Sequence, residues 1–286
     1  MNMMNASEVL LHSTIRIECD CMNGQSTGTG FFFQFLDNKE EGKSVPVIVT
    51  NKHVVKNASI GILRFSLNDE KDEKAKDKYC EVRLDRFEAR WIMHPEDNVD
   101  LCILPIASIC EDLASKGYSI QCAYCNMDVV PTQKEIEEQI TCIEDITVIG
   151  YPDGIWDEVN NRPIVRRGIT ATSLQLDFNG KPDFLIDAAI FGGSSGSPVF
   201  LFNQGAFPMP NGGICAGSRI KLVGIVRAVA QHTTTGEFRI IDIPTVQKPI
   251  SVTPIPNNLG VVIHARKLRA FETLLEQIIA KNSPKQ

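Results

Sequence analysis

The stretch FGGSSGSPVF, residues 191–200, places three serines within four positions, at Ser194, Ser195 and Ser197. Glycines stand directly around them, which is typical of a backbone that turns sharply and allows another group to come close. A serine hydroxyl is a weak nucleophile unless a base lies beside it and an acid orients that base. The stretch is therefore a candidate nucleophile turn, and it predicts a histidine and an acidic partner elsewhere in the chain.

Two earlier segments supply a histidine and an aspartate next to apolar runs. His53 lies in TNKHVV, residues 50–55, directly after the apolar run VPVIV. Asp100 lies in NVDLCIL, residues 98–104, where it opens an alternation of apolar residues. The candidates follow in the order His53, Asp100 and then the three serines, with 47 residues from His53 to Asp100 and 95 from Asp100 to the middle serine, Ser195. Each motif alone is weak, whereas the three in this order are a strong signal for a Ser-His-Asp arrangement.

Strand signals dominate the chain around these motifs. Short runs rich in Val, Ile and Phe, most of them bounded by Gly, Asn, Asp or Pro, are typical of β-strands. These runs cover residues 13–19, 30–36, 45–51, 59–67, 81–93, 100–106, 144–152, 163–173, 183–190, 197–203, 220–231 and 260–265. So many short strands predict an all-β fold, either a sandwich or a pair of barrels.

The remaining segments read as one helix, one connection and two surface loops. Residues 265–281 carry apolar side chains at helical spacing, which predicts a C-terminal helix that packs on the body. Residues 107–143 are interpreted as the connection between two β halves. The mixed charges of 68–78 and the prolines of 244–258 predict solvated loops.

Composition limits the class of protein. The chain has 286 residues, of which 43% are hydrophobic, enough to bury the core of one large domain or two small ones. A net charge of −6 argues against a broad contact with nucleic-acid phosphates. The N-terminal residues lack the features of a signal peptide, and no apolar run is long enough for a membrane span. We therefore expect a cytoplasmic protein that binds neither nucleic acid nor membrane.

Nine cysteines, an odd and scattered set, predict reduced thiols and no disulfide framework. Cys122 and Cys125 have CxxC spacing, which also allows a metal or redox site. A zinc site would need a second pair of ligands, and the sequence offers no other pair at ligand spacing. Buried free thiols are the favoured interpretation, with no metal and no cofactor.

Together, the motifs resemble those of the trypsin/chymotrypsin-like serine peptidases, and of their intracellular prokaryotic branch in particular. TNKHVV is similar to the histidine motif, VDLCILPI to the aspartate motif and GSSGSPVF to the G-x-S-G-x-P motif of that family. The intervals are also close to the values of about 45 and 93 in the chymotrypsin template. The resemblance runs from about Gly28 to the C-terminal helix.

The resemblance implies two packed antiparallel six-stranded β-barrels with a C-terminal α-helix. We expect an N-terminal barrel over residues 1–115 that carries the histidine and the aspartate. A connection over 116–139 would lead to a C-terminal barrel over 140–263 that carries the serine. Residues 264–286 would form the helix and tail.

The resemblance also assigns roles to the candidate residues. Ser195 would be the nucleophile, His53 its general base, and Asp100 the acid that orients the imidazole. The backbone N–H groups of Gly193 and Ser195 would form the oxyanion hole. The catalytic cycle would need no metal or cofactor.

Other residues could compete for these roles. Ser194 as nucleophile would need a shift of the peptide register, and Ser197 lies next to Pro198. Asp97 precedes the apolar alternation and reads as a turn residue, as does His94. The remaining histidines have no partner motif: His12, His232 and His264.

The resemblance places the substrate-binding residues near two segments. Ala189, six residues before Ser195, would lie at the base of the primary specificity pocket. Arg227, Ala228 and Val229 would form the strand that pairs with the substrate backbone. Without an aspartate at the base, and with a β-branched residue at the rim, we expect a small or medium apolar side chain at P1.

Two features depart from the digestive members of the family. Those enzymes have an aspartate where this chain has Ser194, and it pairs with an N-terminal amine released by cleavage. A neutral serine cannot form that ion pair, so we expect the neighbouring loop to be held in another way, through substrate or a partner. An insertion over 150–173 would expose Trp156, Asp157 and Glu158 at its tip.

The resulting hypothesis is a serine endopeptidase that works through an acyl-enzyme on a protein or peptide substrate. We expect narrow specificity or control by a regulatory protein partner, in a bacterial defence or regulatory system. Two alternatives stay open from the residues. One is a peptidase fold kept as a low-activity binding or sensor module that needs a partner to form its site. The other is hydrolysis of an ester in place of a peptide.

Overall fold

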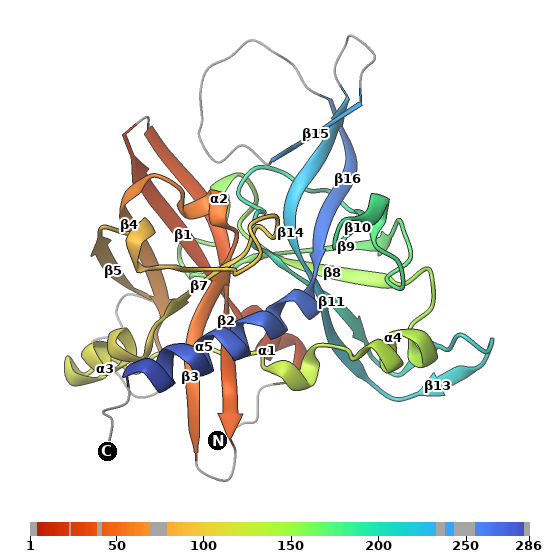
Figure 1. Ribbon diagram of the computed structural model, residues 1–286, viewed down its shortest axis with the longest axis horizontal. Helices are drawn as coiled ribbons and strands as arrows, with labels where there is room; N and C mark the ends of the chain where they lie inside the picture. The colour runs from red at the N-terminus through yellow and green to blue at the C-terminus, as the bar shows by residue number, and fades with distance from the viewer. Residues whose placement is uncertain are drawn as a thin grey trace.

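The computed structural model describes residues 5–22, 24–38, 42–68, 79–232, 238–242 and 255–282. Its strands form two seven-stranded antiparallel sheets that lie side by side, and a helix at the C-terminal end crosses in front of them (Figure 1). The predicted loops over 68–78 and 244–258 fall mostly outside the described residues. The mostly β fold with a C-terminal helix is confirmed.

The first sheet contains the strands of the N-terminal part of the chain, in the order β5-β4-β1-β2-β3-β7-β6. Their bounds are β1 Thr14–Cys21, β2 Gly24–Asn38, β3 Lys43–Thr50, β4 Ala58–Ser66, β5 Tyr79–Asp85, β6 Ile92–Met93 and β7 Cys102–Pro105. Among the described residues no pairing joins β5 to β6, so hydrogen bonds do not close this sheet into a ring. The strand predicted over 81–93 is interrupted, because Arg86 has a φ of 50° and a 3-10 turn follows at Glu88–Arg90.

The second sheet is a closed barrel. Its strands follow the order β11-β8-β9-β10-β16-β14, and β11 pairs with β14 to complete the ring, while β15 extends β14 on its outer side. Their bounds are β8 Asp145–Gly150, β9 Ile164–Thr170, β10 Asp183–Asp187, β11 Pro198–Asn203, β14 Arg219–His232, β15 Phe238–Asp242 and β16 Ile255–His264. A small hairpin of β12 Ala206–Pro208 and β13 Ile214–Ala216 projects from it. The six-stranded C-terminal barrel is thereby confirmed.

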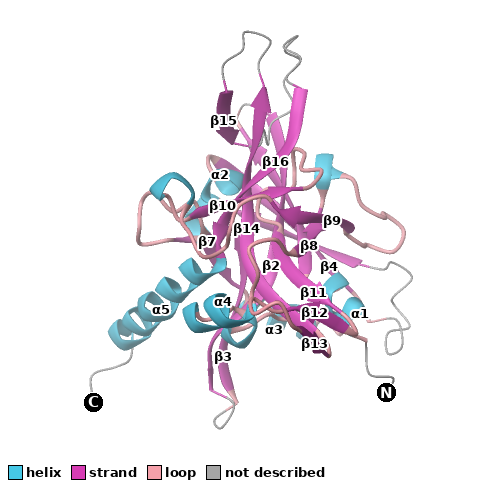
Figure 2. Cartoon of the chain, turned by 90° about the vertical axis from the view of Figure 1, so that its right-hand side faces the viewer, coloured by secondary structure: helices cyan, strands magenta, loops and turns pink. Residues whose placement is uncertain are grey.

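Helices are short except at the C-terminal end. They are α1 Ala6–Leu11, α2 Lys52–Val55, α3 Ala107–Ser115, α4 Gln133–Gln139 and α5 Arg269–Asn282, the last preceded by a 3-10 turn at Ala265–Leu268. In the side view, α3, α4 and α5 gather toward the lower end of the molecule, while β15 and β16 rise at its upper end (Figure 2). No helix in the described ranges is both long and apolar enough to span a membrane.

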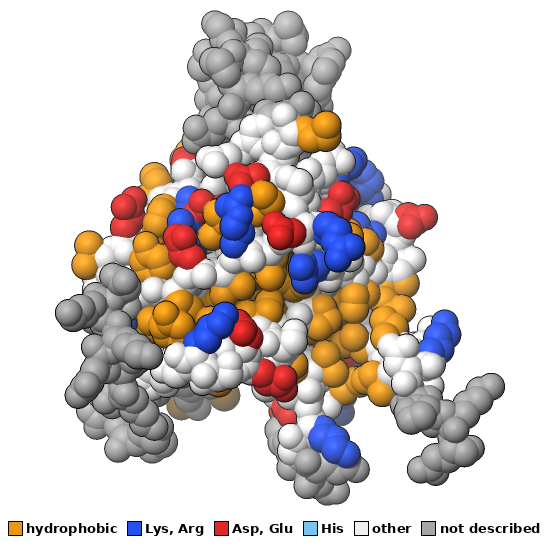
Figure 3. Space-filling model, turned by 90° about the vertical axis from the view of Figure 1, so that its left-hand side faces the viewer, with side chains coloured by type: hydrophobic (Ala, Val, Ile, Leu, Met, Phe, Trp, Pro, Cys, Tyr) orange, Lys and Arg blue, Asp and Glu red, His pale blue; other side chains and the backbone are white. Residues whose placement is uncertain are grey.

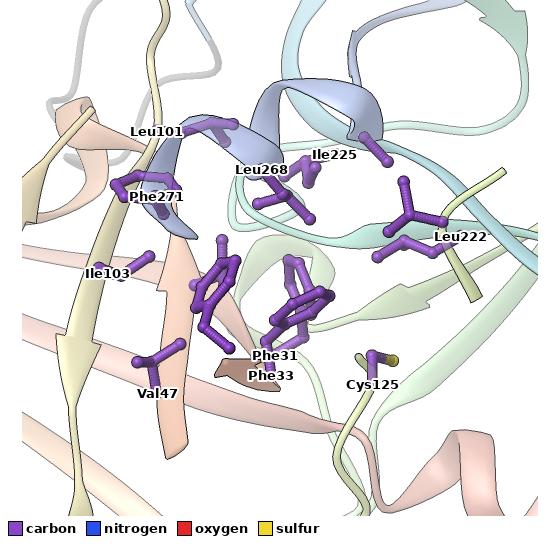
Figure 4. Packing of buried hydrophobic residues seen from close by; sticks show 14 of the residues in the cluster. Phe31, Phe33, Val47, Leu101, Ile103, Cys125, Leu222, Ile225, Leu268 and Phe271 are labelled. Atoms are coloured by element: carbon purple, nitrogen blue, oxygen red, sulfur yellow. The ribbon is translucent and has the colours of Figure 1, made fainter. Parts of the chain in front are cut away.

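The packing between the two halves depends on β2, which is buried on both faces. Phe32 belongs to the core of the first sheet, whereas Phe31, Phe33 and Phe35 alternate with it and face the second barrel and α5. Figure 4 shows Phe31 and Phe33 between strands of both halves and the C-terminal helical segment. Because this apolar cluster joins both sheets and α5, it fixes the seam at which the site residues meet.

The left-hand side of the molecule carries a groove between β5 and α3. Apolar side chains gather there between charged ones (Figure 3). Its lining includes Tyr79, Val82, Ile109, Leu113 and Tyr118. None of the predicted site residues lines this groove.

Candidate active site

The structure brings His53, Asp100 and Ser195 into one hydrogen-bonded row at the seam between the sheets. His53 Nδ1 lies 2.5 Å from Asp100 Oδ2, and His53 Nε2 lies 2.9 Å from Ser195 Oγ. A carboxylate accepts only, so Nδ1 carries the proton and Nε2 is left as an acceptor for the serine hydroxyl. The row can therefore take a proton from Ser195 Oγ.

His53 and Asp100 both lie at the ends of neighbouring strands of the first sheet, β3 and β7. His53 lies on α2, a single helical turn that starts directly after β3. Its backbone N–H donates to Asp100 Oδ1 at 3.1 Å, and Asn51 Nδ2 donates to the Asp100 backbone carbonyl at 2.8 Å. Asp100 thus holds both the backbone and the ring of His53, which fixes the direction of the imidazole.

Ser195 lies in a tight turn between β10 and β11 that only glycines allow. Gly193 has a φ of 79° and Gly196 a φ of 86°, values that residues with a Cβ rarely adopt. A Cβ at Gly193 would also clash with the Tyr151 carbonyl, and one at Gly196 would clash with the Thr29 carbonyl. These contacts explain the glycine pattern of the motif.

The oxyanion loop, defined as residues 192–195, presents two free N–H groups. Within the described residues, the N–H groups of Gly193 and Ser195 donate to no protein acceptor. The carbonyls around them are all held. Asp153 N–H donates to Gly192 O, Thr29 Oγ1 donates to Gly193 O at 2.9 Å, and Thr29 N–H donates to Ser195 O at 2.9 Å. Two N–H groups beside a serine hydroxyl can bind a developing oxyanion.

The rival serines have other environments. Ser194 Oγ accepts a long hydrogen bond of 3.4 Å from Phe191 N–H. Ser197 Oγ is buried without a hydrogen-bond partner and lies against Gly150. Neither hydroxyl forms a hydrogen bond with His53 among the described residues. Asp97, the rival orienting acid, is exposed on its turn.

His94 and His12 form hydrogen bonds that link distant segments of the chain. His94 Nε2 donates to the Lys267 carbonyl at 3.0 Å, and its Nδ1 accepts from Glu96 N–H at 3.1 Å. Burial lowers the pKa of His94, and burial together with the charge of Arg162 lowers the pKa of His12 to about 4. Both rings are therefore neutral hydrogen-bonding links near neutral pH.

Of the predicted specificity residues, Ala189 precedes the serine turn in the chain, while Arg227, Ala228 and Val229 lie on β14, where Ala228 and Val229 already pair with both β15 and β16. Ala189 is half-buried after β10, and Ala228 and Val229 are fully buried on β14. Val229 belongs to the core of the second barrel. Arg227 sits at a β-bulge, and its guanidinium holds Asp183, with Nη2 2.8 Å from Oδ2. The substrate contacts of these four residues stay predictions.

The inserted segment differs from the expectation at its tip. Asp157 and Glu158 are exposed as expected, but Trp156 is half-buried. The guanidinium carbon of Arg16 lies 3.8 Å from the centre of the indole ring, and that of Arg64 lies 5.4 Å away. The segment therefore docks on the first sheet, where stacked cations and an aromatic face attract each other.

Sequence reasoning missed Thr29, which contacts the oxyanion loop directly. A signal was present in Gly28-Thr29-Gly30, where a polar residue stands between two glycines ahead of a run of phenylalanines. A Cβ at Gly28 would clash with Val54, and one at Gly30 with Ile48. Glycines on both sides therefore allow the strand to pass close to its neighbours.

The CxxC cysteines carry raised pKa values. Burial raises the pKa of Cys122 to about 11 and that of Cys125 to about 12, so both are protonated thiols near neutral pH. Thiolates are the form that binds zinc, so these environments do not favour a metal site. In the described part of the chain, no three His, Cys, Asp or Glu side chains group as metal ligands.

A two-sheet β fold with serine, histidine and aspartate in a hydrogen-bonded row is the arrangement of the chymotrypsin-type serine hydrolases. The family model of the trypsin-like peptidase domain matches residues 28–207, more than half of the chain. The chain therefore belongs to the trypsin-like peptidase domain family.

Solved structures with similar folds include the HtrA-type protease AlgW with tripeptide, at 16% identity and a TM-score of 0.49. The match covers 96% of this chain and 63% of that chain, so this chain spans less than two thirds of its length. Another is the MamO protease domain from Magnetospirillum magneticum in its apo form. It is 11% identical, with a TM-score of 0.45 and coverage of 93% of this chain and 98% of that chain. No curated protein sequence gives a significant match.

Proposed function

We propose that the chain is a serine endopeptidase that hydrolyses peptide bonds through an acyl-enzyme on Ser195. One observation carries this proposal. His53 lies between the other two residues, with Nε2 2.9 Å from Ser195 Oγ and Nδ1 2.5 Å from Asp100 Oδ2. These are the distances at which a base takes a proton from a serine and an acid stabilises the imidazolium that forms.

In the proposed cycle, Ser195 Oγ attacks the scissile carbonyl carbon as its proton moves to His53 Nε2. The carbonyl oxygen becomes an oxyanion that accepts hydrogen bonds from Gly193 N–H and Ser195 N–H. His53 then gives its proton to the leaving amine, the C–N bond breaks and the acyl-enzyme remains. A water molecule, deprotonated by His53, attacks the acyl carbon and releases the acid, and the proton returns to Ser195 Oγ.

We further propose that the P1 residue is small or medium-sized and apolar. Ala189 offers no charge at the expected base of the pocket, so a Lys or Arg side chain would lack a counter-ion there. Narrow specificity, a regulatory protein partner, a place in a bacterial defence or regulatory system, and membership of the intracellular prokaryotic branch stay predictions from the resemblance. Hydrolysis of an ester uses the same steps and is tested below.

The binding-module alternative is not favoured. It requires an oxyanion loop that a partner completes, whereas Thr29 and Asp153 of the same chain already anchor the loop carbonyls. A pure scaffold would also have no need for the hydrogen-bonded row.

The proposal is tested by labelling the isolated chain with a fluorophosphonate and measuring its intact mass. We expect one adduct on the wild type, none on Ser195→Ala or His53→Ala, and an unchanged adduct on Ser194→Ala. A folded wild type that never reacts would contradict the proposal. Matched peptide and ester substrates with Ala, Val, Leu, Lys or Asp at P1 then measure the preferred bond and side chain.

A further inference from the structure

We infer that Thr29 is a positioning residue that holds the oxyanion loop in its catalytic conformation and aligns it with His53. The inference rests on the proposed function, because it assigns a role within that active site. Thr29 lies on β2 of the first sheet and is fully buried. Its hydrogen bonds in the described part of the chain go to neighbours of the triad and none to His53, so it acts through the backbone of those neighbours.

Thr29 uses every polar group it has. Its hydroxyl donates to Gly193 O at 2.9 Å and accepts from Tyr151 N–H at 3.0 Å. Its backbone N–H donates to Ser195 O at 2.9 Å. Its backbone carbonyl accepts from Thr50 Oγ1 at 2.7 Å. One residue of the first sheet thus binds two carbonyls of the turn that carries the nucleophile.

The carbonyls matter because each peptide group is planar, so fixing its C=O fixes its N–H in the opposite direction. Four consecutive carbonyls of the oxyanion loop are anchored. Asp153 N–H holds the carbonyl of Gly192, Ser197 N–H holds that of Ser194, and Thr29 holds those of Gly193 and Ser195. The Gly192 and Ser194 carbonyls share their peptide groups with the N–H groups of Gly193 and Ser195, so Asp153 and Ser197 set the direction of these two donors. The bonds from Thr29 hold the two peptide groups that follow Gly193 and Ser195, so neither oxyanion donor can rotate together with its neighbour.

Gly193 needs such an anchor more than another residue would. A glycine rotates its adjoining peptide groups at little cost, and a rotated peptide would turn an N–H away from the substrate. Within the described residues, the side chain of the neighbouring Ser194 makes only the 3.4 Å hydrogen bond with Phe191 N–H. The Thr29 hydroxyl, which bonds to both Gly193 and Tyr151, is a shorter link and reaches the segment that carries Asp153.

Thr29 also connects the serine turn to the histidine. Thr50, which bonds to the Thr29 carbonyl, is the last residue of β3 and lies three positions before His53. The position of Ser195 is therefore set relative to the strand that leads into α2. Ser195 Oγ and His53 Nε2 come from different halves of the chain, and this short path through Thr29 joins them.

The test compares Thr29→Val, which removes the hydroxyl at nearly constant size, with Thr29→Ser, which keeps it. For Thr29→Val we expect the fluorophosphonate labelling rate and kcat to fall about 10-fold to 100-fold, because both hydrogen bonds of the hydroxyl are lost. KM should stay within about 2-fold, because Thr29 is fully buried and offers no surface to a substrate. Affinity for a peptide boronate, which forms a tetrahedral adduct, should fall with kcat/KM. Thr29→Ser should stay within about 3-fold of the wild type.

A matched control separates positioning from stability. Thr170 is equally buried, donates its hydroxyl to the Cys142 carbonyl at 3.1 Å and accepts from Glu144 N–H at 2.9 Å. Thr170→Val should lower the melting temperature as Thr29→Val does but leave kcat and labelling unchanged. If Thr29→Val does not fold, Thr29→Cys, with a weaker donor of similar size, should show the same loss of kcat.

Two results would overturn the inference. One is a folded Thr29→Val protein that labels at the wild-type rate, and the other is a Thr29→Ser protein as impaired as Thr29→Val, which would assign the effect to the methyl group. Failure of the proposed function looks different, because the wild type itself would then remain unlabelled. In that case the inference fails with it.

Discussion

Asp100 accepts two hydrogen bonds from the same histidine, one from the backbone N–H of His53 at 3.1 Å and one from its ring at 2.5 Å. The carboxylate therefore sets both the place where α2 begins and the direction of the imidazole. Asp100→Asn keeps the shape but puts an amide where the imidazole needs an acceptor. We expect kcat to fall about 10⁴-fold near neutral pH, because the wrong tautomer would face Ser195. Steady-state kinetics on a peptide ester measures the loss.

Asp97→Asn is the matched control for this change, since Asp97 is exposed three residues earlier. Its kcat should equal that of the wild type. Equal losses in the two variants would refute the assignment of Asp100 as the orienting acid.

Gly193→Ala should slow labelling by the fluorophosphonate about 100-fold or more. The new methyl group would have to avoid the Tyr151 carbonyl, and the φ of 79° is unfavourable for alanine, so the oxyanion loop must shift. Gly205→Ala is the control, because Gly205 has a similar φ of 90° but open space around it. It should lose some stability and no labelling. Intact-mass time courses on both variants provide the comparison.

Trp156→Ala should lower activity from a distance. Trp156 stacks on Arg16, and the same segment carries Asp153, whose N–H anchors Gly192. Loss of the stacking, about 0.5–2 kcal/mol, should loosen this anchor and lower kcat about 3-fold to 10-fold. Trp156→Phe should recover part of it. Phe207→Ala, which removes a similar stacking on Arg219 at 4.4 Å, should lower stability alone. Equal kcat for Trp156→Ala and the wild type would show that docking of this segment does not affect catalysis.

Stability should fall as the pH drops from about 6.5 to 4.5. The pKa values of His12 and His264 are lowered to about 4, mainly by burial, and the pKa of His94 is lowered as well. Below pH 6.5 the unfolded chain therefore binds protons that the folded chain does not, which favours unfolding. We expect His12 and His264 to contribute on the order of 1 kcal/mol each. Melting temperatures between pH 7.5 and 4.5 measure the slope.

His12→Gln should flatten part of this slope, because glutamine does not titrate. Glu135, whose pKa is lowered to about 2 by Lys221 and the Thr132 cap, stabilises the fold fully above its ordinary value of 4.5, and this contribution is lost only as the pH falls below 4.5. The two windows are therefore separate. A melting temperature that stays constant between pH 7 and 5 would contradict the prediction.

The triad and most strands could be predicted from the sequence because their signals are local. His53, Asp100 and Ser195 each stand in a short motif beside an apolar run, and period-2 alternation marks the strands. The closed barrel and α5 follow the same patterns. The predicted exposure of Trp156 was wrong, and the role of Thr29 was missed, because both depend on partners far along the chain. Trp156 stacks on Arg16 of β1, and the Thr29 hydroxyl donates to Gly193 O, 164 positions away. No local pattern carries that information.

The break in the strand predicted over 81–93 has a different cause. All its residue types suit a strand, but Arg86 adopts a positive φ, and Phe87 then packs fully buried against Gly61. Tertiary packing thus overrides local preference. The helix α4 was missed for another reason. Thr132 and Glu135 form a capping box, and this pattern in the predicted connection indicates a helix start.

The aromatic side chains of β2 have a consequence for how the molecule comes apart. Phe31, Phe33 and Phe35 belong to the contact between the halves, so separating the halves would expose three rings, each with about 150–250 Å² of surface. Each half alone would therefore expose a large apolar surface to water. Heating should therefore give one calorimetric transition, and a single proteolytic cut between α3 and α4 should leave two fragments that remain associated and active.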